Sequence, residues 1–184
     1  MFTATHRPLT VHDYYTLPEH GPQYQLVEGE LQMAPAPNRF HQVISGNLEY
    51  ILRKYLENHP IGKIYDAPFD VYLSDVNVYQ PDILFLAKKH YGLETKQGLR
   101  GGPDLVVEIL SPETSELDLG VKREVYARCG VEELWIIDPE NPGISIFHLQ
   151  KNAETPVKVV ASSGEWSTTL FPGLNIEAEA VFHD

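Results

Sequence analysis

The chain has a single cysteine, Cys129, among its 184 residues. One cysteine excludes an intramolecular disulfide and fits a reducing compartment. No stretch approaches the roughly 20 consecutive apolar residues that a membrane-spanning helix needs. Residues 1–8 also lack the apolar core of a signal peptide. These absences predict a cytoplasmic protein with no membrane partner.

Basic residues are scarce: 14 Lys and Arg stand against 26 Asp and Glu, a formal net charge of -12. This balance argues against broad, charge-driven binding to nucleic acid, because that affinity comes from Lys and Arg neutralising phosphates. A nucleic-acid enzyme is still compatible with it, since a carboxylate-lined site can load a divalent cation. The length predicts one domain over residues 1–184.

Apolar periodicity and turn residues divide the chain into helices and strands. The expected helices cover residues 11–17, 38–58 and 114–129, the last capped by Thr114 or Ser115 and stopped by Gly130. The expected strands cover residues 24–28, 30–33, 62–65, 69–73, 82–86, 104–110, 133–138, 143–149 and 157–161, with a further β segment ending near Phe171. Residues 90–102 are expected to form a polar, mobile loop.

The strand, helix and strand over residues 104–138 make a βαβ unit, whose two strands should be parallel. The strands before it are expected to be antiparallel. The predicted fold is therefore α/β, with a mixed central sheet flanked by helices and with extra antiparallel strands in a C-terminal extension over residues 143–184.

Glu108 lies in the middle of the otherwise apolar strand 104–110. An unpaired charge in a low-dielectric interior costs several kcal/mol, so such a residue usually has a shifted pKa, a partner or a metal. Alternate side chains of a strand share a face, which puts Glu108 opposite the apolar face of Leu105, Val107 and Ile109. Glu108 is therefore a candidate site residue, with a buried salt bridge to Lys122 or Arg123 as the structural alternative.

Asp82 is a second carboxylate, at the start of the apolar strand that follows Pro81. If the strands of Asp82 and Glu108 are neighbours, the two carboxylates can converge on one cation. Mg²⁺ suits such a site because it takes one or two carboxylates and fills its other positions with water and phosphate. The alternative for Asp82 is a strand-end cap or turn residue.

Lys122 borders an expected apolar stripe of Leu117, Val121 and Val125 on the third helix. A lysine in this position can lay its stem on apolar surface and direct its ammonium group toward the sheet edge. There it could stabilise the charge that develops on a phosphate. The alternative is a solvated lysine paired with Asp118.

A family resemblance becomes apparent from these motifs. Pro81-Asp82 followed by Glu108 resembles the PD-(D/E)XK nuclease signature, with Leu110 at the usual lysine position. Within that superfamily the chain resembles the Uma-type restriction endonuclease group, long classed as of unknown function. The resemblance spans residues 10–150 and rests on Val27–Glu30, His41, Gln80–Ile83, Pro103–Pro112, Asp118, Lys122, Tyr126, Gly130–Val131 and Glu133–Pro139.

The resemblance implies a restriction-endonuclease-like fold and roles for particular residues. Asp82 and Glu108 would bind Mg²⁺, for which Mn²⁺ can substitute, together with the backbone carbonyl of Ile109. Lys122 would replace the strand lysine and stabilise charge. Of two secondary candidates, Glu30 would approach the metal through water, and His41 would contact phosphate or be a helix-start residue. The implied substrate is DNA, and a homodimer is expected by analogy.

The leading functional hypothesis is a metal-dependent endonuclease that hydrolyses DNA phosphodiesters. The alternative is a noncatalytic nuclease-fold binding or assembly protein, in which Glu108 and Lys122 form a structural pair. A glycosidase acid and base is a third interpretation, disfavoured by the lysine and by the lack of aromatic sugar platforms. Trp135 and Trp166 are expected in the core, and the histidines show no zinc spacing.

Overall fold

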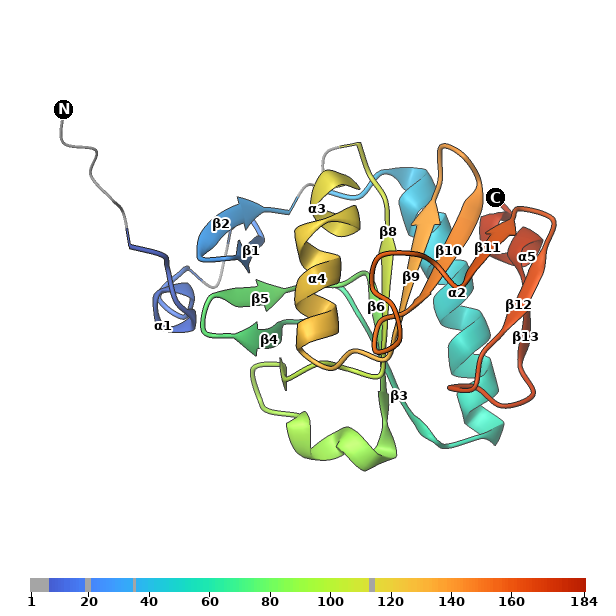
Figure 1. The fold of residues 1–184 in the computed structure, drawn as a ribbon, viewed down its shortest axis with the longest axis horizontal. Coiled ribbons are helices and arrows are strands. Elements are labelled where there is room, and N and C mark those ends of the chain that lie inside the picture. The colour runs from blue at the N-terminus through green and yellow to red at the C-terminus, as the bar shows by residue number, and fades with distance from the viewer. Residues whose placement is uncertain (1–6, 19–20, 35, 113–114) are drawn as a thin grey trace.

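The computed structural model describes residues 7–18, 21–34, 36–112 and 115–184. Its centre is a six-stranded sheet in the order β11-β10-β9-β8-β6-β3 (Figure 1). These strands are β3 (Gly62–Asp66), β6 (Ile83–Ala87), β8 (Leu105–Ile109), β9 (Glu133–Asp138), β10 (Gly143–His148) and β11 (Lys158–Ala161). β8 and β9 pair in parallel and the other neighbours are antiparallel, so the predicted βαβ unit and mixed sheet are confirmed.

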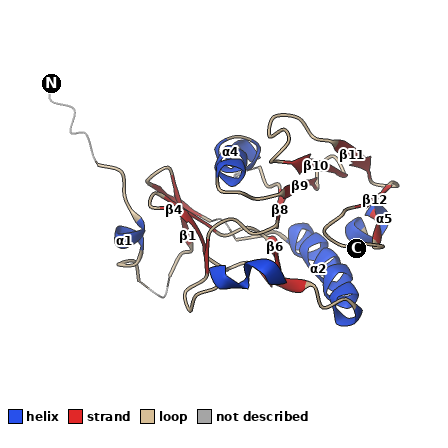
Figure 2. Ribbon diagram, turned by 60° about the horizontal axis from the view of Figure 1, so that its bottom comes forward, coloured by secondary structure: helices blue, strands red, loops and turns tan. Residues whose placement is uncertain are grey.

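Helices cover both faces of this sheet (Figure 2). On one face, α2 (Arg39–Asn58) buries Ile44, Leu48 and Leu52 against a core that includes Leu105, Val107 and Ile109. Asn38 caps α2 by accepting a hydrogen bond from the His41 amide, at 2.9 Å. On the other face, α4 (Val121–Arg128) buries Val125 and Tyr126 against the opposite side chains of β8 and β9. Strand alternation thus gives Glu108 a position beneath α4, away from the α2 core.

The expected third helix is interrupted at Gly120. The described part consists of α3 (Ser115–Leu119) and α4, and Gly120 between them has φ -110° and ψ -104°, outside the helical region. The predicted cap Thr114 lies outside the described residues, and Ser115 is the first residue of α3. The predicted apolar stripe is also wrong at Val121, which is exposed, whereas Lys122 is buried. The break resets the helical phase, so that Lys122, Val125 and Tyr126 face the sheet.

A second sheet, in the order β2-β1-β5-β4-β7, lies beside the first (Figure 1). It consists of β1 (Tyr24–Val27), β2 (Glu30–Met33), β4 (Val71–Ser74), β5 (Asn77–Tyr79) and β7 (Leu99–Arg100), next to the short helix α1 (Val11–Tyr14). The strands expected over residues 24–28 and 30–33 are present as β1 and β2, which form an antiparallel hairpin. Glu28 and Gly29 form its turn with φ values of +49° and +83°, a pair typical of two-residue hairpin loops.

The polar loop expected over residues 90–102 contains parts of two short elements. A 3₁₀ helix, η1 (Lys88–Leu93), begins before it, and β7 pairs in parallel with β4. This pairing is non-local in sequence, and β7 has only two residues, too few for an alternation pattern to be recognised. Gly98 also packs closely against the carbonyl oxygen of Asp70. The same oxygen accepts a 2.9 Å hydrogen bond from the backbone amide of Leu99.

The C-terminal extension packs on the α2 side of the molecule. β12 (Glu165–Ser167) and β13 (Asn175–Glu177) form a hairpin, and α5 (Ala178–Phe182) follows it. Trp166 packs edge-to-face on Trp135, so both tryptophans lie in the core as expected. Asn47 on α2 donates hydrogen bonds to the carbonyls of Val181 and His183, at 3.2 and 2.7 Å. Among the helices in the described ranges, none has the length and apolar character needed to cross a bilayer.

Candidate active site

A cleft of about 590 Å³ opens at the carboxyl end of β8, between the β1–β2 hairpin, the start of α2 and the α3–α4 segment. It is lined by Pro22, Gln23, Gln25, Ala34, Ala36, Pro37, Asn38, His41, Ala67, Pro68, Gln80, Asp82, Glu108, Ile109, Ser111, Pro112, Asp118 and Lys122. Five of the predicted site residues, His41, Asp82, Glu108, Ile109 and Lys122, therefore share one cavity.

Asp82 and Glu108 come together because β6 and β8 are antiparallel neighbours. Ile83 is paired with Val107, and the same register continued by one residue sets Asp82 opposite Glu108. Side chains opposite each other in such a pair lie on the same face. Asp82 Oδ2 also accepts a 2.7 Å hydrogen bond from the amide of Ile109, which attaches the Asp82 carboxylate to the end of β8.

Glu108 is almost completely buried, with 3% of its surface exposed. Its Oε1 accepts a 2.6 Å hydrogen bond from the Tyr126 hydroxyl and lies 3.3 Å from Lys122 Nζ. Burial raises the pKa of Glu108 to about 8, against the opposing effect of Lys122, and the charges of Asp118 and Asp82 add to the rise. In the absence of metal, the site therefore holds a proton that ordinary glutamates have lost at neutral pH.

Lys122 is buried between two carboxylates. Its Nζ lies 2.8 Å from Asp118 Oδ1 and 3.3 Å from Glu108 Oε1. Burial acts to lower the pKa of Lys122, but Glu108 and Asp118 outweigh it and the pKa is raised. Lys122 is therefore a permanent cation at the wall of the cleft. The structural alternative for Lys122 was a solvated lysine paired with Asp118. The pairing is present, but Lys122 is buried and not solvated.

His41 contacts Asp82 and Ile109, two of the residues that were predicted to bind a metal. Its Nε2 lies 3.2 Å from Asp82 Oδ1, and its ring hydrogen-bonds to the backbone of Ile109. Because the Ile109 amide is engaged by Asp82, the carbonyl of Ile109 is the acceptor. Burial acts to lower the pKa of His41, but the hydrogen bond and charge of Asp82 outweigh it and the pKa is raised. His41 is therefore a cation over a wider pH range than an ordinary histidine.

Glu30 is not brought to this cleft. It lies exposed at the start of β2, opposite Val27, whereas Ala34, just beyond the other end of β2, reaches the cleft lining. Two further residues were not predicted as site residues, although Asp118 was named as a partner of Lys122 in the structural alternative. Asp118 and Tyr126 stood in the family motif, and their spacing from Lys122 of four residues in each direction was the available signal.

The residues present fit a hard divalent cation. Asp82, Glu108 and the Ile109 carbonyl are oxygen donors in one cleft, and hard divalent cations prefer oxygen ligands. Among the described residues, no group of three or more His, Cys, Asp or Glu side chains is arranged to enclose a metal. Such an arrangement is not required by Mg²⁺, which keeps several water ligands. The donor set therefore suits Mg²⁺ better than zinc.

The mixed sheet between helices, with carboxylates at adjoining strand ends, defines a protein of the restriction-endonuclease-like class. The chain belongs to the Uma2 family, described as "Putative restriction endonuclease", whose model matches residues 11–179. It is similar to a crystal structure from Anabaena variabilis ATCC 29413 described as a "putative nuclease belonging to DUF820". The TM-score is 0.79 and the sequence identity 20%, with 95% of this chain and 98% of that chain covered. At this identity the likeness establishes the fold. A comparison with curated proteins gives no match.

Proposed function

We propose that this protein is a Mg²⁺-dependent endonuclease that hydrolyses phosphodiester bonds of DNA. The observation that carries the proposal is the meeting of Asp82, Glu108 and Lys122 in one cleft. Membership of the Uma2 family supports a nuclease, and the oxygen donors support a hard metal ion.

Asp82, Glu108 and the Ile109 carbonyl would hold the metal. When bound, Mg²⁺ supplies a Lewis acid for a phosphoryl oxygen and lowers the pKa of water. Glu108 must give up its proton on loading, and Lys122 makes the resulting carboxylate less costly in the buried site. His41 must also release Asp82 and the Ile109 carbonyl for both to serve as ligands.

Lys122 has a second role in this proposal. Its ammonium group is held at the cleft wall by Asp118, so it needs no reorganisation to face a negatively charged phosphate. Because its pKa is raised, it acts as an electrostatic stabiliser and does not serve as a base. Asp118 is a positioning residue, which acts through Lys122.

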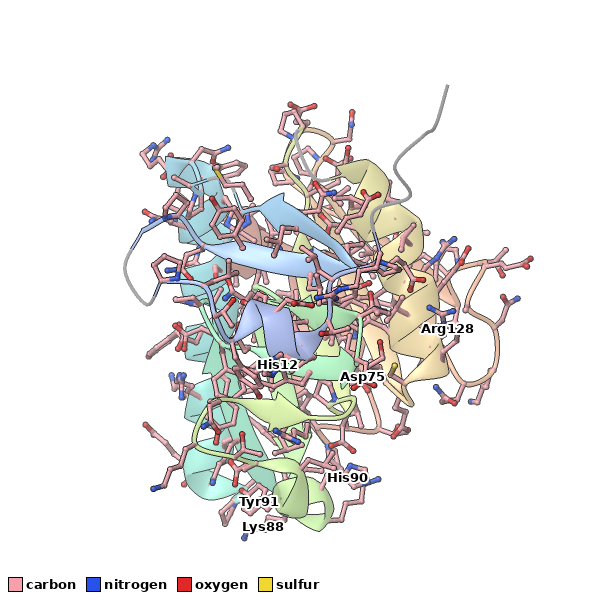
Figure 3. The ribbon with its side chains drawn as sticks, turned by 90° about the vertical axis from the view of Figure 1, so that its left-hand side faces the viewer. His12, Asp75, Lys88, His90, Tyr91 and Arg128 are labelled. Carbon is pink, nitrogen blue, oxygen red and sulfur yellow. The ribbon has the colours of Figure 1, made fainter. Side chains whose placement is uncertain are left out.

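Cleavage of supercoiled plasmid in Mg²⁺ or Mn²⁺ tests the proposal. We expect conversion to open-circular and linear forms by the native protein, and none by Asp82→Asn, Glu108→Gln or Lys122→Met. Asp75→Asn is the matched control, because Asp75 is an exposed carboxylate on the β4–β5 turn, outside the cleft (Figure 3). Equal cleavage by Asp75→Asn and Asp82→Asn preparations would identify a contaminating nuclease and contradict the proposal.

One observation favours the second candidate, a noncatalytic nuclease-fold protein. Lys122 Nζ already lies 3.3 Å from Glu108 Oε1 within the fold, as in a structural pair. The two functions differ in their response to metal. A loaded site stabilises the native state by mass action, whereas an internal ion pair gives no Mg²⁺-dependent rise in melting temperature.

A further inference from the structure

A second cavity, of about 360 Å³, lies beside the cleft on the face formed by α1, β1 and β4. Figure 3 views the molecule from this side, with α1, which carries His12, in front of the strands of the smaller sheet. The cavity is lined by Tyr14, Tyr15, Leu17, Pro18, Gly21, Pro22, Gln23, Tyr24, Asp70, Tyr72, Gln80 and Gln97. We call it the tyrosine pocket, because four of its lining residues are tyrosines.

Two of these tyrosines are held in place by a half-buried acceptor, Asp70. The two carboxylate oxygens of Asp70 accept hydrogen bonds of 3.0 Å, one from the Tyr14 hydroxyl and one from the Tyr72 hydroxyl. Gln80 Nε2 donates to Asp70 at 2.8 Å. Burial raises the pKa of Tyr14 and of Tyr72, and the charge of Asp70 adds to both shifts, so the phenols are neutral donors. The aromatic walls are thus fixed before any ligand arrives.

Tyr15 offers an accessible ring in this pocket. It is 44% exposed, and its ring centroid lies 5.5 Å from that of Tyr72 with an interplanar angle of 36°. Because the two rings are tilted, Tyr72 does not stack face to face on Tyr15. A planar ligand can therefore lie on Tyr15 without displacing a core residue.

The tyrosine pocket adjoins the candidate active-site cleft. Pro22, Gln23 and Gln80 line both cavities. Gln80 is separated by a single residue from Asp82, so the shared wall adjoins the proposed metal ligands. A chain molecule with one unit in the tyrosine pocket can therefore present its neighbouring unit to the cleft.

The lining also indicates which part of a nucleotide would enter. No Lys or Arg is among the described residues of the pocket wall, and the Asp70 carboxylate disfavours a phosphate there. Arg100, outside that wall, donates a 3.4 Å hydrogen bond to the Tyr15 hydroxyl at the pocket's edge. Three glutamine amides, of Gln23, Gln80 and Gln97, provide donors and acceptors for the edge of a base. Aromatic faces and amides are the groups that bind unstacked nucleobases in single-stranded nucleic acids.

We propose that the tyrosine pocket binds one unpaired nucleobase of the substrate strand next to the phosphate in the cleft. The substrate class would then be nucleic acid with a single-stranded segment at the cleavage site, because the base of an intact duplex has no free face. This inference rests on the proposed nuclease function.

Equilibrium binding of a labelled single-stranded oligonucleotide tests the subsite without any cleavage, in EDTA. Loss of one base stack predicts that Tyr15→Ala weakens binding by about 5- to 150-fold. Tyr15→Phe keeps the ring and should retain most of the affinity. Tyr50→Ala is the matched control, since Tyr50 is an exposed tyrosine of α2 outside both cavities, and should bind as the native protein does.

An abasic scan locates the base. In oligonucleotides that lack one base at successive positions, native binding should fall at one position, and Tyr15→Ala should cause no further loss there. A blunt duplex of the same sequence should bind more weakly than the single strand. Native-like binding by Tyr15→Ala, an effect independent of the abasic position, or preference for the duplex would each overturn the proposal.

Cleavage assays keep the two proposals distinguishable. A native protein that binds the single strand through Tyr15 but cuts no substrate in Mg²⁺ or Mn²⁺ would refute the nuclease function alone. Cleavage with no contribution of Tyr15 to binding would refute the subsite alone. Photocrosslinking of a 5-iodouridine oligonucleotide to the native protein, with the adduct mapped to Tyr15 or Tyr72, supports the subsite without a variant, and an adduct elsewhere counts against it.

Discussion

The Tyr126 hydroxyl donates a 2.6 Å hydrogen bond to Glu108 Oε1, the oxygen that also faces Lys122. Both residues project from α4, and both contacts are to the same oxygen. This leaves Oε2 without either of these two partners, so Tyr126 orients the carboxylate for a ligand in the cleft. The Tyr126 ring is itself held edge-to-face against Tyr79, at 5.4 Å.

Removal of this hydroxyl should weaken metal binding without unfolding the protein. Tyr126→Phe keeps the ring packing but makes the Glu108 anion more costly. Loss of an outer hydrogen bond to a metal ligand typically costs about 10- to 100-fold in affinity. Isothermal titration with Mg²⁺ checks the prediction, with Tyr50→Phe as control. Unchanged affinity in Tyr126→Phe would show that the hydroxyl has only a packing role.

Lys122→Met should destabilise the fold strongly. It leaves Glu108 and Asp118 buried without their common cation, and breaking a buried ion pair on one side typically costs about 3–5 kcal/mol. Urea unfolding measures this loss, with Lys54→Met on the exposed side of α2 as a control. Adding Glu108→Gln to Lys122→Met should recover part of the stability, because coupled residues are not additive. Additive losses would mean that the two side chains do not interact.

Mg²⁺ binding should release protons at neutral pH. Because the pKa of Glu108 rises from 4.5 to about 8 on folding, the metal-free native state holds a proton that the unfolded chain has lost. Its contribution to stability is therefore full below pH 4.5 and is lost as the pH rises to about 8. Titrations at pH 7 in buffers of different ionisation enthalpy should report proton release by the native protein and none by Glu108→Gln, which loses the metal. Identical heats in all buffers would contradict the pairing of Asp82 and Glu108 at one metal.

His41 should oppose metal binding at low pH. Its protonated ring occupies Asp82 and the Ile109 carbonyl, and the raised pKa means that this cation persists above the usual range for histidine. We expect His41→Ala to bind Mg²⁺ more tightly than the native protein at pH 6, and the difference to diminish in alkaline buffer. Weaker binding at both pH values would instead make His41 a metal ligand.

The sheet and the approach of Asp82 to Glu108 could be predicted because they follow from local patterns. A carboxylate within an apolar strand and another at a strand start are visible in sequence, and the βαβ unit sets the parallel pair. The sequence analysis left open whether the two strands are neighbours, and the structure supplies the β6–β8 register that aligns the two carboxylates.

The remaining features depend on contacts between distant segments. Lys122 is buried only because Glu108 and Asp118 receive its charge, which helical periodicity cannot reveal. The interruption at Gly120 changes the phase of the helix and exposes Val121. The tyrosine pocket requires α1, β1 and β4 to meet around Asp70, and Tyr14 and Asp70 are 56 positions apart.

Thermal unfolding with Mg²⁺ or with EDTA tests the central claim most directly, because it does not depend on a correct choice of substrate. The native protein should gain about 2.7 kcal/mol when Mg²⁺ exceeds its dissociation constant 100-fold, seen as a higher melting temperature. Asp82→Asn and Glu108→Gln should lose this gain, while Asp75→Asn keeps it. An equal melting temperature of the native protein in Mg²⁺ and in EDTA would contradict a metal site between Asp82 and Glu108.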